Sequence, residues 1–561
     1  METEQTPMNV IAKHIAEAID EPAIAAHSAV LDSAHVGDIR GAMGTIRLDD
    51  QGPRHGWWAR IKTLLAIVGP GLIVMVGDND AGAFSTYTQA GQNYGTALLW
   101  TLALLVPVLY VNQEMVLRLG AVTGVGHARL IFARFGKFWG SFSVIDLFLL
   151  NALTIVTEFI GISLALGYLG LPRLAGVIVS ALLVMGAAST GSFRRFERFS
   201  LVLVAGSFLL IPVVLMVHPP LGRIAHDFVV PGFPAGARLS DVMLLIIGIV
   251  GTTVAPWQLF FQQSYVIDKR ITPRFIRYER LDLVFGIVIV IVGAVAMMAF
   301  AAETFAGHPE FGQFTDAGAV SAGLEKYVGK LPGVLFAIAL IDACIIGASA
   351  ISLATAYAIG DVLSLKHSLH RKPGEAKGFY GVYCALIAIA AALVLIPGVP
   401  LGLLTNAVQT LAGVLLPSAS VFLLLLCNDK AVLGPWVNSK ATNAFTGLVV
   451  AVLVMLSVIL TAAVVFPDLG SGAILGILVG CSVFGVLLVL LVRLLKKDSG
   501  AEPEAAGFSA RGNWRMPPLA ELPPGRLTLL NRIWVGVLRA YLVVATGMVI
   551  VRVVQLALAH R

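Results

Sequence analysis

The sequence predicts an all-α polytopic membrane protein. Of its 561 residues, 57% are hydrophobic and only 13% are charged, whereas soluble domains carry about 25% charged residues. The apolar blocks reach the roughly 20 residues that a helix needs to cross about 30 Å of hydrocarbon. They lack the short alternating segments of an outer-membrane barrel. The lipid bilayer is therefore the predicted surrounding of most of the chain.

The apolar blocks divide the chain into five parts. Residues 1–58 form a polar N-terminal tail without the basic start and apolar core of a secretory signal. Blocks follow at about 64–88, 96–117, 143–168, 171–190, 199–217, 241–266, 281–303, 332–360, 379–397, 402–427, 442–466 and 472–494. We expect a transporter core at 59–430, two additional transmembrane helices at 431–495, a polar linker at 496–531 and a C-terminal hydrophobic helix at 532–561. The last helix carries Arg539 and Arg552 and either spans or lies in the interface, so the prediction is about 12–13 transmembrane helices.

Basic residues predict the orientation. They gather before the first block and after the second, fourth, sixth, eighth, tenth and twelfth, as in the loop with Lys269, Arg270 and Arg274. Cytoplasmic loops carry an excess of Lys and Arg. We therefore expect an integral protein of the cytoplasmic (inner) membrane with a cytosolic N-terminus. The net charge of +6 then follows from topology, with no nucleic-acid partner.

Two blocks are interrupted at comparable places. Polar and small residues break the first block at Gly77–Ala83, and Pro256 breaks the sixth within Gly251–Gln258. The blocks are five apart, as expected for an inverted five-plus-five repeat in which the first helix of each half is broken at the membrane midplane. Such free backbone groups are tolerated only beside a cavity or inside protein. The alternative is a pair of packing kinks, because Gly and Pro are common in membrane helices.

Asp80 is the strongest candidate for a functional residue. A carboxylate near the bilayer centre normally faces a partner or a water-filled cavity, and the first block has no Lys or Arg to pair with it. Asp78 and Asn79 add hard oxygen donors, which suit Mg²⁺, Ca²⁺ and Mn²⁺. We expect a cation at Asp80 and an ion pathway that includes Asp78 and Asn79; alternatively, Asp78 caps a half-helix.

Four other polar residues lie within the apolar blocks. Glu158 in the third block serves either the ion pathway or a structural hydrogen bond. Glu114, near the end of the second block, is interpreted as structural. Asp342 in the eighth block is a weaker candidate for a cation path. Gln409 in the tenth block, taken alone, is interpreted as a contact between helices.

Several motifs together resemble the NRAMP family of divalent metal transporters. Gly69–Gly91 resembles its first helix, Arg118–Gly124 its loop after the second helix, and Glu158–Gly161 its Glu-x-Ile-Gly pattern. Pro256 fits the break in its sixth helix. The similarity covers roughly residues 60–430, in order. It implies a leucine-transporter-type fold, alternating access, and a divalent metal ion as substrate rather than cofactor.

The departures from the family pattern concern the metal site. The first-helix motif Asp-Pro-Gly-Asn reads Asp80–Ala83 here, so that Ala83 replaces an asparagine ligand. The sixth-helix motif Met-Pro-His reads Ala255–Trp257. A second family histidine falls on Gln262, and an aspartate of the family's proton path falls on Ile155. Gln409 aligns with a glutamine that helps hold the metal.

These departures imply a hard cation. Loss of the thioether removes the preference for softer ions, and a wider site suits Mg²⁺, which usually keeps several waters. Without the histidines, which titrate near neutral pH, proton coupling is expected to be weak or absent. The chain is similar in this to the NRAMP-related magnesium transporters. The expected ligands are the Asp80 carboxylate, backbone carbonyls near Ala81, Thr252 and Ala255, and the side chains of Gln258 and Gln409.

Three alternatives remain. The first is a proton-coupled Mn²⁺ or Fe²⁺ importer of the ordinary family type, in which Asp78, Glu158 or Asp342 accepts the proton. The second is a carrier of an organic solute with Na⁺, although Asp80 would repel a carboxylate at the half-helix N-terminus. The third is a channel. An enzyme is not expected, because the sequence shows no nucleophile–base pair, phosphate loop or His-rich cluster. The sequence makes no prediction of oligomeric state.

Overall fold

The computed structural model describes residues 29–50, 52–397, 405, 408, 411–412, 419–466, 470–495, 511–512, 514–523, 525, 536, 543 and 547. Its elements are η1 (Ser33–His35), β1 (Ile39–Gly41), β2 (Gly44–Ile46), α2 (Trp57–Ile67), α3 (Pro70–Val76), α4 (Ala81–Tyr94), α5 (Trp100–Thr123), α6 (His127–Phe135), α7 (Lys137–Tyr168), α8 (Arg173–Ala188), α9 (Phe193–Gly206), η2 (Ser207–Leu209), α10 (Leu210–Val217), α11 (Leu221–Val229), α12 (Leu239–Thr253), α13 (Pro256–Asp268), η3 (Pro273–Phe275), α14 (Ile276–Phe305), α15 (Ala317–Tyr327), α16 (Lys330–Val362), α17 (Lys377–Val394), α19 (Lys430–Leu433), η4 (Gly434–Trp436), α20 (Lys440–Val465), α21 (Ser471–Leu495) and η5 (Leu519–Glu521). The chain is thus overwhelmingly helical, as predicted.

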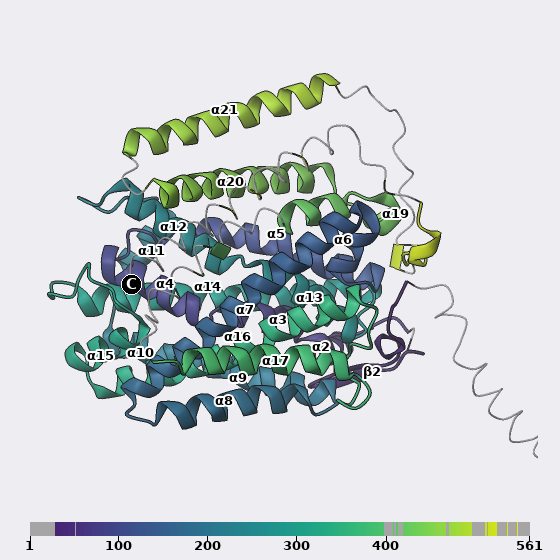
Figure 1. Ribbon diagram of the computed structural model, residues 1–561, viewed down its shortest axis with the longest axis horizontal. Coiled ribbons are helices and arrows are strands. Elements are labelled where there is room, and N and C mark those ends of the chain that lie inside the picture. The colour runs from purple at the N-terminus through teal and green to yellow at the C-terminus, as the bar shows by residue number, and fades with distance from the viewer. Residues whose placement is uncertain are drawn as a thin grey trace, which may run out of the picture.

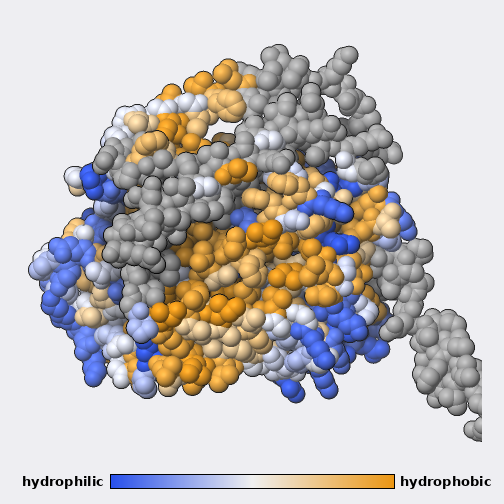
Figure 2. All heavy atoms as spheres, in the orientation of Figure 1, coloured by the Kyte–Doolittle hydropathy of each residue, from blue (hydrophilic) through white to orange (hydrophobic). Residues whose placement is uncertain are grey.

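The long helices run roughly side by side along one axis (Figure 1). Within the described residues, eight helices are long and apolar enough to span a bilayer, two bent pairs bring the number to ten, and α8 and part of α21 are shorter apolar helices. Figure 2 shows an apolar band across the middle of the bundle with hydrophilic residues at both ends. The eight long helices, two bent pairs and two shorter helices of the described residues correspond to the twelve apolar blocks of the sequence. The last predicted hydrophobic segment lies almost entirely outside the described residues, and the linker before it is described only at residues 511–512, 514–523 and 525.

Both predicted breaks are present. Residues 77–80 separate α3 from α4, and residues 254–255 separate α12 from α13. Pro256 stands at the first turn of α13, where its missing N–H has no intrahelical partner to lose. A further bend of 51° between α2 and α3, at residues 68–69, was not predicted.

The two broken helices pack against different partners. The α3 and α4 segments pack on α14, while α13 packs on α16 and α5, and α7 packs along α16. Backbones approach closely where α4 crosses α14, since a Cβ at Gly91 would lie 2.2 Å from the Met298 carbonyl oxygen. Small residues allow such approach between membrane helices. The two breaks are thereby enclosed by α7, α14 and α16 near the centre of the bundle.

Part of the predicted N-terminal tail is built into the structure as a strap, residues 29–50. Its strands β1 and β2 pair antiparallel with Ile39 opposite Ile46 and pack on α2 at one end of the bundle, here named the hairpin end (Figure 1). A Cβ at Gly41 would lie 2.0 Å from the Ala66 carbonyl oxygen, so only glycine fits this contact. The tail is therefore not only a polar extension.

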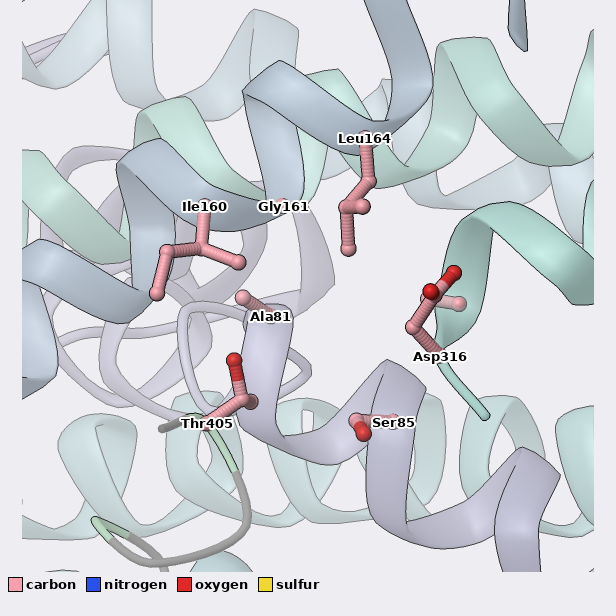
Figure 3. A pocket seen from close by; sticks show the side chains of 8 residues that line it. Ala81, Ser85, Ile160, Gly161, Leu164, Asp316 and Thr405 are labelled. Carbon is pink, nitrogen blue, oxygen red and sulfur yellow. The ribbon is translucent and has the colours of Figure 1, made fainter. Parts of the chain in front are cut away.

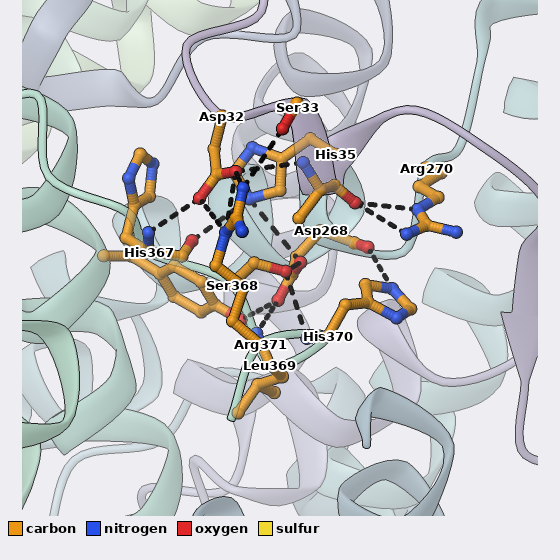
Figure 4. Close-up of polar contacts among 12 residues, drawn as sticks. Asp32, Ser33, His35, Asp268, Arg270, His367, Ser368, Leu369, His370 and Arg371 are labelled. Carbon is orange, nitrogen blue, oxygen red and sulfur yellow. Dashed lines mark hydrogen bonds and ion pairs between the residues drawn. The ribbon is translucent and has the colours of Figure 1, made fainter. Parts of the chain in front are cut away.

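Polar contacts attach the strap to two loops at the hairpin end (Figure 4). Asp32 accepts hydrogen bonds from the Arg371 guanidinium at 2.5 Å and from the His367 amide at 2.9 Å. His35 Nε2 lies 3.1 Å from the His367 carbonyl oxygen and 3.5 Å from Asp268 Oδ1. The Arg270 guanidinium bonds to the carbonyl oxygen of Ala34 at 2.7 Å. The strap thus links the end of α13 to the loop that follows α16.

Candidate cation site

Asp80 begins the second half of the first broken helix. It is the N-cap of α4, and its Oδ1 accepts a hydrogen bond from the Ala83 amide at 3.0 Å. The N-terminus of a helix carries partial positive charge and unpaired amides, which favour a carboxylate here. The side chain is buried. The backbone therefore fixes Asp80 at the break, and Ala83 contributes to the site through its amide.

Glu158 of α7 meets Asp80 at this break. Its Oε2 accepts a hydrogen bond from the Ala81 amide at 3.1 Å, and the carboxyl groups of Asp80 and Glu158 lie within hydrogen-bonding reach of each other. Glu158 Oε1 has no hydrogen-bond partner among the described residues. Two buried carboxyl groups this close need a proton or a cation between them. The structure thus brings together two of the residues predicted from the sequence.

Gly347 of α16 makes room for this pair. A Cβ at Gly347 would lie 3.0 Å from Glu158 Oε2 and 3.1 Å from Asp80 Cβ. These separations are tight for a buried methyl group. No pattern in the sequence singles out Gly347, because only the packing of α16 on α4 and α7 shows what it faces. The carboxyl pair therefore lies at the meeting point of three helices.

Asp78 and Gln258 connect the first break to the second. The Gln258 side-chain amide donates to Asp78 and accepts from Gln113 Nε2 at 2.9 Å. Asp78 Oδ2 has no partner within the described part of the chain. Gln258 therefore links Gln113 of α5 to Asp78 at the first break. No pattern in the sequence marks Gln113 as part of the site.

The second break lies against the first. Tyr87 of α4 and Thr253 of α12 share a hydrogen bond of 2.6 Å between their hydroxyl groups, and a Cβ at Gly77 would lie 3.6 Å from the Trp257 ring. Thr252 Oγ1 is buried and finds no partner among the residues that the structure describes. The Ala255 carbonyl oxygen accepts a hydrogen bond from the backbone amide of Gln258 at 3.2 Å. Thr252 and Ala255 are therefore at the break, as predicted.

Other predicted residues lie elsewhere. Asn79 faces α14, with Nδ2 3.3 Å from the Val290 carbonyl oxygen. Asp342 faces α9, since a Cβ at Gly206 would lie 2.3 Å from its Cγ. Glu114 forms ion pairs with Arg118 and Arg280, at 3.2 and 2.5 Å. Gln409 lies outside the described residues.

A small pocket begins at Ala81, the residue that follows Asp80 (Figure 3). From Ala81 it extends along α4 and α7 toward Asp316, the N-cap of α15. Its other lining residues are Ser85, Ile160, Gly161, Leu164, Ala317 and Thr405. Ser85 follows Ala81 by one helical turn, so both lie on one face of α4. The pocket is therefore small and mostly apolar, with the hydroxyl groups of Ser85 and Thr405 and the Asp316 carboxyl group in its wall.

The donor set is made mainly of oxygen atoms, and the buried Cys344 thiol lies beside Glu158. Among the described residues, no three His, Cys, Asp or Glu side chains are close enough together to hold a metal ion. The site instead offers two carboxyl groups, the Thr252 hydroxyl and backbone groups of the two breaks. Such donors suit a hard cation that keeps part of its water shell.

Comparisons with known proteins agree with this architecture. The family described as Natural resistance-associated macrophage protein-like matches residues 71–463. The divalent metal cation transporter MntH of Ralstonia nicotianae is 31% identical over 408 residues, which cover 70% of this chain and 89% of that protein. MntH 1 of Pseudomonas aeruginosa is 28% identical over 403 residues, 68% of this chain and 88% of that protein.

Solved structures show the same fold. A crystal structure of the Eremococcus coleocola manganese transporter, in complex with an aromatic bis-isothiourea compound, aligns with a TM-score of 0.60 at 21% identity, covering 80% of this chain and 98% of that one. A crystal structure of a histidine-to-alanine mutant of the same transporter aligns with a TM-score of 0.59 at 20% identity, covering 81% and 97%. The fold is therefore of the leucine-transporter type, as the resemblance implied. With two broken helices, a carboxyl pair at the break and a family match over most of its length, the chain belongs to the Nramp family.

Proposed function

We propose that the protein is a secondary carrier that moves a divalent metal cation across the cytoplasmic membrane by alternating access. The observation that carries the proposal is the meeting of Asp80 and Glu158 at the break of the first helix. A divalent cation neutralises this buried pair, which otherwise needs a proton. The names of the relatives, which are divalent metal cation transporters, support the same substrate class.

We further propose that the carrier favours Mg²⁺, with Mn²⁺ second. The second break presents Ala255 and Trp257 and no sulfur ligand. Thioether sulfur favours softer ions, whereas carboxylate, carbonyl and water oxygens suit Mg²⁺ and Mn²⁺. Two small side chains, Ala83 and Ala255, leave space for waters that Mg²⁺ retains. Selectivity is thus proposed to come from oxygen donors and space.

Proton coupling is proposed to be absent. Trp257 and Gln262 stand where the family pattern has histidines, and neither titrates near neutral pH. One observation favours the second candidate, a proton-coupled importer of Mn²⁺ or Fe²⁺. Glu158 Oε1 is buried and free of hydrogen bonds within the described residues, so this carboxyl group could carry a proton while Asp80 holds the metal.

The direction of entry follows from the proposed orientation. If the hairpin end faces the cytosol, as the basic loops predict, the pocket from Ala81 to Asp316 lies on the outer side of the carboxyl pair. An inside-negative potential then favours inward flow, by about 2.3 kcal/mol per charge at 100 mV and about twice that for a divalent ion.

Transport into proteoliposomes tests the proposal. Purified full-length protein is reconstituted, and uptake of Mg²⁺ and of Mn²⁺ is measured separately while internal pH is recorded. Uptake of Mg²⁺ without acidification supports an uncoupled carrier. Mn²⁺ uptake with acidification, and no Mg²⁺ uptake, would replace it with the proton-coupled candidate. When the same uptake is measured for a Glu158→Gln variant, Glu375→Gln, on an exposed loop, serves as the charge-matched control.

A further inference from the structure

The bend between α2 and α3 is enclosed by buried ionisable side chains that the proposed transport site does not use. They come from α9, the end of α13 and α14, and all are 0% exposed: Glu197, Lys269, Glu279 and Asp282. The bend itself is 51° and lies at residues 68–69. Helix bends free carbonyl and amide groups that need partners away from water. Two of the four side chains supply these partners.

Lys269 binds the last carbonyl groups before the bend. Its Nζ donates to the carbonyl oxygens of Ile67 at 2.6 Å and Val68 at 2.8 Å, and to Glu197 Oε1 at 2.6 Å. The other Glu197 oxygen accepts from the Ala42 amide of the strap at 2.5 Å. Lys269 and Glu197 therefore form a fully bonded ion pair on one side of the bend.

Asp282 binds the first amides after the bend. Its Oδ2 accepts from the Gly69 amide at 3.1 Å, the Gly71 amide at 2.7 Å and the Leu72 amide at 3.3 Å. These are the unpaired donors at the start of α3, where the helix dipole also favours a negative charge. Asp282 therefore caps the start of α3 through Oδ2, while its Oδ1 is buried and has no hydrogen-bond partner among the described residues.

Glu279 lacks the set of amide hydrogen bonds that Asp282 makes. It precedes Asp282 by three residues on α14 and so shares its face. Neither of its carboxyl oxygens makes a hydrogen bond of good geometry with a described residue, although the Gly71 amide, which Asp282 binds, lies close to it. The charged groups that act on it are Asp282, Lys269 and Glu197, and the Tyr265 hydroxyl of α13 lies beside the same cluster. Three carboxyl groups thus lie around the Lys269 ammonium group, whose hydrogen bonds already go to Glu197 and to two backbone carbonyl oxygens.

We propose that the Glu279 carboxyl group is a proton-binding site. While Glu279 is protonated, the α2–α3 bend keeps the hydrogen-bonded conformation described above. A buried carboxyl group without a partner takes up a proton rather than remain charged. When the proton leaves, Glu279 repels Asp282, and the hold of Asp282 on the amides of α3 weakens. The site is separate from the carboxyl pair at the breaks.

Hydrogen–deuterium exchange tests this site without any transport. Full-length protein in nanodiscs is exchanged between about pH 6 and about pH 9, and rates at residues 57–76 are corrected for intrinsic exchange. Wild-type protein is expected to exchange faster at these residues as pH rises. Glu279→Gln, which mimics the protonated group, is expected to keep the slow rate throughout. Glu303→Gln, an exposed position on the same helix, is expected to follow the wild type.

Each other outcome overturns the proposal. A flat wild-type profile, or a Glu279→Gln profile that rises like the wild type, means that Glu279 does not hold the titrating proton. If Na⁺ or K⁺ lowers the exchange rate of the wild type at residues 57–76 at alkaline pH, a monovalent cation rather than a proton occupies the site. Infrared spectroscopy of the wild type gives a check that needs no variant: a protonated-carboxyl band must disappear over the same pH range. If no protonated-carboxyl band disappears over this pH range, the proposal is overturned, whether or not the protein transports metal.

Discussion

Glu158 Oε2 on α7 accepts a hydrogen bond from the Ala81 amide at the start of α4, at 3.1 Å. This bond joins the third predicted membrane block to the break in the first. It places the Glu158 carboxyl group against Asp80, so that the two charges depend on a shared counter-ion. Cation binding is therefore expected to respond to changes at either residue and at the helices that confine them.

Glu158→Gln keeps an oxygen that can accept from Ala81 but removes the charge. We expect the fold to persist and the affinity for Mg²⁺ to fall by about 10- to 100-fold, the range seen when a group that supports a metal ligand is changed. Isothermal titration calorimetry on the purified protein measures this. Unchanged affinity would show that Glu158 plays only a structural role at the break.

Gly347→Ala places a methyl group 3.0 Å from Glu158 Oε2 and 3.1 Å from Asp80 Cβ. We expect loss of metal uptake and a destabilisation of about 1–3 kcal/mol, typical of overpacking. Gly381→Ala on α17 is the matched control, since its Cβ meets none of the described atoms within 4 Å. If both variants transport and melt like the wild type, the carboxyl pair is not confined by α16.

Ala255→Met restores a thioether at the second break. Because sulfur ligands favour softer ions, we expect the ratio of Cd²⁺ to Mg²⁺ uptake to rise about tenfold, which corresponds to about 1.4 kcal/mol. Ala255→Leu adds similar volume without sulfur and should slow both ions alike. Equal ratios in the two variants would place Ala255 away from the ion.

The strap should loosen at alkaline pH. Burial opposes a charge on His367, but the Asp361 carboxylate, 3.1 Å from Nε2, outweighs it and raises the pKa of His367 to about 9 from 6.5. The stabilisation from protonated His367 is therefore complete below about pH 6.5 and is lost as pH rises through about 9. His35 does not share this change, because burial lowers its pKa.

Limited trypsin digestion measures this change at the exposed Arg40 and Arg47 of the strap. Relative to an unfolded control peptide, cleavage of the wild type is expected to accelerate between about pH 7 and about pH 9. His367→Gln should be cleaved quickly at every pH, whereas His55→Gln, at an exposed position before α2, should behave as the wild type. A pH-independent wild type would mean that His367 does not hold the strap.

Local signals in the sequence were sufficient to predict the elements that they act on. Pro256 and the run around Asp80 mark the two breaks, because Gly, Pro and capping residues act on the backbone close to them. The sequence predicted that Glu158 lies on a membrane helix, and it lies on α7. Only the packing of α7 against the first break brings it to Asp80. For Asn79 the direction of the side chain was not predictable, and it faces α14 although it adjoins Asp80.

Contacts between distant segments were not predictable. The strap bonds to one loop more than 300 residues away, as Asp32 does to Arg371, and no local pattern encodes such pairing. Lys269 was counted among the basic residues that set the orientation, yet its side chain is 0% exposed and binds the bend of the first helix. A count of charges along the chain does not separate a solvated lysine from a buried one.

Metal binding by Asp80→Asn tests the central claim most directly, with Asp342→Asn as a matched control. Both residues are intramembrane aspartates, but Asp342 faces α9 rather than the breaks. Calorimetric titration with Mg²⁺ and Mn²⁺ is expected to show binding by the wild type and Asp342→Asn, and a loss of at least about 100-fold in affinity, or about 2.7 kcal/mol, for Asp80→Asn. Wild-type affinity in Asp80→Asn would contradict the assignment of the cation site.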